Sequence, residues 1–101
     1  MKYQLVIQFP GETEDDFEHL IDLENELEEK LTGQSEVDGH DFGSGEMNIF
    51  VLSDEPIDTF KQVKSLLTEQ HLSKMKAAYR DIEAESYTIL WPENLKEFVV
   101  T

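Results

Sequence analysis

The chain has 101 residues, 39% of them hydrophobic, and carries 23 acidic against 8 basic residues for a net charge of −15. Such a charge repels phosphate backbones and anionic lipid, so it argues against nucleic-acid and membrane partners and favours a basic protein as the partner. Without cysteine the chain has neither disulfides nor a thiol nucleophile. At this length we expect one domain over residues 1–101. The N-terminal segment is too short and too polar for a signal peptide or a spanning helix, so we expect a cytoplasmic protein.

The first predicted elements are a strand over residues 2–9 and a helix over residues 13–33. In the strand, apolar residues alternate with polar ones on all but one position, which commits one face to a core, and Pro10 with Gly11 ends it. In the helix, apolar residues recur at three- and four-residue steps. Thr13 and Asp16 have the spacing of an N-terminal capping box, and Lys30 with Gly33 closes the C-terminal end.

The second half of the chain begins with a predicted hairpin of strands 35–42 and 46–52. Gly43 and Gly45 are expected to supply its positive φ angles, and the turn closes through either Gly43-Ser44 or Ser44-Gly45. A second helix follows, capped by Asp54, with Pro56 in its first turn and its end near residues 70–71. Residues 75–82 and 85–91 are predicted strands, and residues 93–101 form a tail.

The order β-α-β-β-α-β, with an extra C-terminal strand or hairpin, predicts an α+β protein with a ferredoxin-like split βαβ arrangement. Its antiparallel sheet would carry both helices on one face. The strand at 46–52 is apolar on both sides, so the opposite face should also be covered, by the C-terminal segment or by a second copy of the chain in a homodimer. The predicted core is Leu5, Ile7, Phe9, Phe17, Leu20, Leu27, Phe60, Val63 and Leu67.

The stretch VDGHDFGSGEMNIFVLSDEP, followed by AAYR and YTILWP, resembles a pattern found in small bacterial one-domain proteins of unassigned function. The resemblance covers the last two-thirds of the chain. It implies one α+β domain and carries no reaction with it.

Asp38 and His40 are the candidate catalytic residues, because an Asp on the same strand face could orient a histidine that acts as general base. A nucleophile and an oxyanion hole are missing, and two ligands do not make a metal site, so we predict neither a metal nor a cofactor. The alternative is structural: Gly39 within a strand marks a bulge or a close backbone approach, and Asp and His tolerate such bends. Arg80 and Tyr87 could add polar groups to a pocket beside the pair.

Helix 13–33 carries a strip of carboxylates on its exposed side, which suggests the first of two hypotheses. In this hypothesis the protein is a non-catalytic interaction or regulatory module, similar to inhibitor or immunity proteins, that docks a basic partner. The second hypothesis is a small enzyme or ligand-binding domain that uses Asp38 and His40 in a pocket at the sheet edge. The composition favours the first, and a solvated helix face is the simplest explanation of the strip. The predicted partner-binding residues are Asp15, Glu18, Asp22, Glu26 and Glu29.

Overall fold

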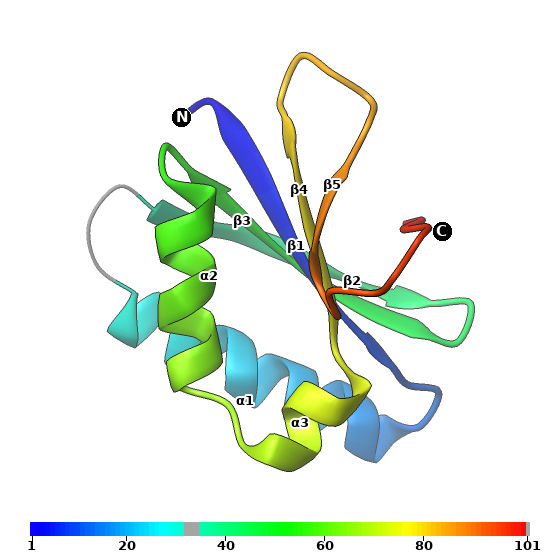
Figure 1. The fold of residues 1–101 in the computed structure, drawn as a ribbon. Helices are drawn as coiled ribbons and strands as arrows, with labels where there is room; N and C mark the ends of the chain where they lie inside the picture. Colours follow the sequence, from blue (N-terminus) through cyan, green and yellow to red (C-terminus); the bar gives the residue numbers. More distant parts are fainter. Residues whose placement is uncertain (32–34, 101) are drawn as a thin grey trace.

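The computed structural model of the chain describes residues 1–31 and 35–100, and this part contains five strands and three helices (Figure 1). In chain order they are β1 (Tyr3–Pro10), α1 (Glu14–Lys30), β2 (Ser35–Gly43), β3 (Glu46–Ser53), α2 (Pro56–Ser65), α3 (Glu69–Lys74), β4 (Lys76–Asp81) and β5 (Thr88–Trp91).

The strands form one sheet in the order β2-β3-β1-β4-β5, and all neighbouring strands are antiparallel. β1 lies at the centre, where Ile7 pairs with Ile49 of β3 and with Ala77 of β4. The odd-numbered residues from Leu5 to Phe9 of β1 and from Met47 to Val51 of β3 share one core with Leu20 and Leu27 of α1 and with residues of α2. Both helices therefore cover the same face of the sheet, as the apolar stripes predict.

α1 is fixed at its N-terminus by the predicted capping box. The Thr13 hydroxyl accepts a hydrogen bond from the Asp16 backbone N–H at 3.1 Å, and the Asp16 carboxylate accepts one from the Thr13 backbone N–H at 3.1 Å. These bonds satisfy two of the N–H groups that a helix start leaves without partners. The predicted closing residue Gly33 lies outside the described residues.

The opposite face of the sheet is covered in part by the C-terminal segment. Val6 and Ala78 on this face are fully buried, and Gln8 is only 4% exposed. The Gln8 side-chain amide donates hydrogen bonds to the Val99 carbonyl at 2.9 Å and to Asn48 Oδ1 at 3.0 Å. The structure therefore supports the first of the two predicted coverings. The homodimer remains a prediction.

The element order matches the predicted β-α-β-β-α-β with an extra C-terminal strand only in part, because it contains one more helix than predicted. The expected second helix is divided into two helices. α2 ends at Ser65, and Thr68 begins α3 by accepting a hydrogen bond from the His71 backbone N–H. Thr68 lies in the last turn of the expected helix, and because threonine is a good N-cap it starts a new helix there. His71 consequently lies inside α3 and not at a helix end. Of the helices in residues 1–31 and 35–100, none has the length and apolar character needed to cross a membrane.

Three smaller predictions also fail. Phe17 is 38% exposed, because α1 turns Leu20 and Leu27 toward the sheet and leaves Phe17 at the margin. The expected cap Asp54 instead accepts a hydrogen bond from the Lys2 backbone N–H, and Glu55 precedes Pro56 without a side-chain cap. The hairpin turn places Ser44, and not Gly43, at positive φ (55°) beside Gly45 (78°). Ser44-Gly45 is thus the closing pair.

Candidate functional site

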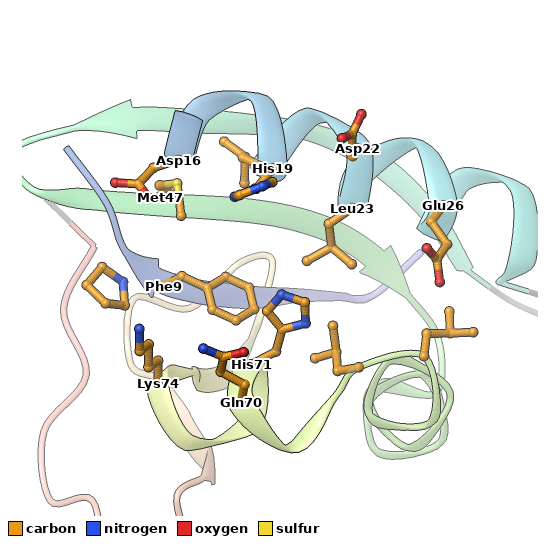
Figure 2. Close-up of a pocket in the computed structure, with 14 residues that line it drawn as sticks. Phe9, Asp16, His19, Asp22, Leu23, Glu26, Met47, Gln70, His71 and Lys74 are labelled. Carbon is orange, nitrogen blue, oxygen red and sulfur yellow. The ribbon is translucent and has the colours of Figure 1, made fainter. Parts of the chain in front are cut away.

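A groove of about 570 Å³ separates α1 from α3 and the turn that precedes α3 (Figure 2). It forms because the helices rest on different parts of the sheet. α1 packs mainly on β2 and β3, whereas α2 packs on β1 and β3. The helical layer is therefore open between them.

The floor of the groove is apolar. Phe9 of β1 and Met47 of β3 come from the sheet and are each 7% exposed. Leu66 and Leu67, in the turn between α2 and α3, and Leu23 of α1 are only partly buried and face the open space. This floor therefore exposes hydrophobic side chains that belong to the margin of the core.

The two rims of the groove differ in charge. The rim on the α1 side is formed by Asp16, His19, Asp22 and Glu26, and the rim on the α3 side by Gln70, His71 and Lys74. Figure 2 shows carboxylates along α1 and, across the floor, the His71 ring beside Phe9, with ring centroids 6.1 Å apart. The groove is thus acidic along one wall and polar to basic along the other.

Asp16 stays ionised through its role in the capping box. The Glu12 and Thr13 backbone N–H groups donate to its Oδ2 at 2.9 and 3.1 Å and hold the pKa of this carboxyl below its ordinary value. One anionic group of the acidic wall is therefore built into the helix N-terminus.

The predicted acidic strip divides at the groove. Asp22 and Glu26 line it, whereas Asp15, Glu18 and Glu29 are exposed on α1 and do not. Glu26 also lies 3.9 Å from Lys30 Nζ, and both side chains are well exposed. Exposed pairs of this kind contribute only about 0.3–0.5 kcal/mol. Glu26 therefore remains accessible to a partner.

The hairpin residues are arranged differently from the prediction. The pairing of β2 with β3 shifts between Val37 and Gly39, so Asp38 is the extra residue of a bulge, and Gly39 has φ 149°. Beyond the bulge His40 pairs with Ile49, a register that the Ser44-Gly45 closure predicts. The predicted bulge is confirmed, and no hydrogen bond joins Asp38 to His40 in the described part of the chain.

His40 is instead bound to a carboxylate that the sequence analysis did not single out. Its Nδ1 lies 3.0 and 3.1 Å from the two carboxylate oxygens of Glu24, which is 8% exposed on the core side of α1. The His40 ring also lies edge-on to Phe17, with centroids 5.8 Å apart. An acidic residue between Leu20 and Leu27 in the apolar stripe was the sequence signal for this pair.

The remaining candidates serve the fold. Arg80 donates to the Gln4 side chain and to the Asp81, Ile82 and Ala84 carbonyls, so it orders the β4–β5 loop. The Tyr87 ring packs on Phe98, with centroids 5.0 Å apart. Within residues 1–31 and 35–100, no cluster of three or more His, Asp or Glu side chains has the arrangement of a metal site.

No family model, no curated protein and no solved structure matches this chain. The similarity to small bacterial proteins of unassigned function therefore stays a prediction. What the protein does has to be inferred from its own residues.

Proposed function

We propose that this chain, a one-domain variant of the split βαβ arrangement with an added helix and strand, is a non-catalytic interaction module that binds a basic partner protein through α1. The observation that carries the proposal is the groove beside α1. Burial of its apolar floor would contribute binding free energy, and its acidic wall would select a positively charged partner.

The charge distribution supports the same face. Ten acidic residues and one basic residue lie between Glu12 and Lys30, a net charge of −9 out of −15 for the whole chain. Such a concentration raises the rate at which a basic protein meets this side of the molecule, and salt screens the effect. A docking role therefore predicts both a preferred face and a strong dependence on ionic strength.

Asp38 and His40 have structural roles in this proposal. His40 is the one hydrogen-bonding partner of the Glu24 carboxylate among the described residues, and this carboxylate would otherwise be buried alone. Asp38 is the extra residue of the bulge that brings His40 to face α1. The pair is thus explained without a reaction.

The test is capture of proteins from a cell extract with the purified chain and matched variants. One variant neutralises α1 (Glu18→Gln, Asp22→Asn, Glu26→Gln, Glu29→Gln). Its control makes the same change in net charge at exposed residues elsewhere (Glu83→Gln, Glu85→Gln, Glu93→Gln, Glu97→Gln). A third variant carries Asp38→Ala and His40→Ala.

The proposal expects a basic protein to be recovered with the wild-type chain, the control and the hairpin variant, and lost with the α1 variant. Equal recovery with the α1 variant and its control would refute it, because net charge alone would then explain binding. Loss with the hairpin variant alone, while that variant is still folded, would favour a site at Asp38 and His40.

A further inference from the structure

The helical layer over the sheet contains a groove lined by apolar side chains. α1 and α2 rest on different strand pairs, and the floor between them is formed by Phe9 and Met47 of the central strands. Three of the leucines that line the gap are partly exposed, Leu23 on one side and Leu66 and Leu67 on the other. Covering these side chains with a further apolar surface would remove them from water, which is favourable in free energy.

The dimensions suit side chains from a helix. Packed helices lie about 8–10 Å apart and interdigitate their side chains. A groove of about 570 Å³ accepts side chains of one helical face, and amphipathic helices are commonly held in apolar grooves by residues spaced three, four and seven apart.

The charges of the two walls favour one orientation of a helix bound in the groove. Asp16, Asp22 and Glu26 line the groove on the α1 side, while Lys74 lies on the opposite wall. A helix with basic residues on one flank is therefore attracted toward α1 on that flank. If it were turned over, the same residues would lie next to Lys74.

From these features we infer that the groove binds a single amphipathic helix of the partner, with its apolar face on the leucines and its basic flank against α1. The inference deepens the proposed function and rests on it. It names the element that is recognised, whereas the proposed function requires only a basic protein bound through α1.

Two synthetic peptides of identical composition serve as probes. One places its leucines on one helical face and its lysines on an adjacent flank, and the other has the same residues in scrambled order. Binding is measured by titration, and the contact is located from the methyl NMR signals of Leu23, Leu66, Leu67 and Met47. The variants are Leu67→Ser, the α1 variant defined above, and Ile57→Ser as control. Ile57 is 52% exposed on α2, outside the groove.

We expect the amphipathic peptide to bind at least about tenfold more tightly than the scrambled one and to shift the four sets of methyl signals. Leu67→Ser should weaken binding about five- to tenfold, as expected for an apolar contact at the centre of an interface, and Ile57→Ser should leave it unchanged. Spectra of the wild-type chain carry this test even if Leu67→Ser does not fold.

The two levels of the proposal fail in different ways. If the α1 variant weakens binding of both peptides equally while the groove methyl signals stay in place, the helix in the groove is refuted and docking through α1 stands. If the α1 variant binds both peptides as tightly as the wild-type chain does, docking through α1 is refuted as well.

Discussion

Replacing His40 by alanine should destabilise the protein through Glu24. The imidazole holds both oxygens of a carboxylate that the α1 sequence places on the core side of the helix. His40→Ala leaves that carboxylate without its partner among the described residues. The effect separates a structural histidine, whose loss costs stability, from a catalytic one, whose loss costs activity alone.

The size of the effect follows from how far each side chain is exposed, 11% for Glu24 and 32% for His40. Breaking a fully buried pair costs about 3–5 kcal/mol, and a hydrogen bond to a charged group contributes about 1.5–3 kcal/mol. Because water reaches the imidazole side of this pair, we expect the lower end, about 1.5–2 kcal/mol. In a domain of this size that lowers Tm by roughly 6–15 °C.

The assay is a double-mutant cycle by urea unfolding with His40→Ala, Glu24→Leu and the double variant. We expect the double variant to be less destabilised than the sum of the single variants, since Glu24→Leu removes the charge that His40→Ala leaves unpaired. Glu28→Leu, one turn along α1 and exposed, is the control and should not couple to His40. Additivity within about 0.5 kcal/mol for Glu24 and His40 would refute the reasoning.

Three further predictions concern α1 and the hairpin. The lowered pKa of Asp16 stabilises the fold at pH values above the ordinary value of 3.8, and this stabilisation is lost as the pH falls through the folded-state pKa. Asp16→Asn should therefore have a lower Tm than the wild-type chain at pH 7, and this difference in Tm should shrink below about pH 4. A difference that stays constant with pH would contradict this. Ser44→Asn should raise Tm, because asparagine tolerates positive φ and precedes a glycine in the favoured hairpin turn, whereas Ser44→Val should lower it. Neutralising like charges three and four residues apart on α1 should raise Tm, and added salt should raise it more in the wild-type chain than in this variant, measured by calorimetry. The neutralised residues are Glu18, Asp22, Glu26 and Glu29.

Local sequence signals predicted the parts of the fold that depend on neighbouring residues. The capping box of Thr13 and Asp16 follows from three-residue spacing, and the bulge follows from Gly39 within a strand. The division between α2 and α3 was missed because the apolar pattern continues through Leu66 and Leu67, where tertiary packing and the Thr68 cap decide the structure.

The candidate site was harder to predict, because it depends on how far apart two helices lie. Asp22 and Glu26 were recognised as exposed acids of α1, but their position in one groove with Leu67 depends on α1 packing on β2 and β3 while α2 packs on β1 and β3. The partner of His40 was missed for a similar reason. The bulge sets which face His40 takes, and only the packed helix brings Glu24 to it.

Stopped flow at increasing ionic strength measures the rate at which the captured basic partner associates with the chain. Docking through the acidic wall of α1 predicts a rate for the wild-type chain that falls steeply with salt. The α1 variant should associate more slowly, with a much shallower dependence, while the charge-matched control should behave like the wild-type chain. Identical salt dependences for the α1 variant and its control would contradict the account.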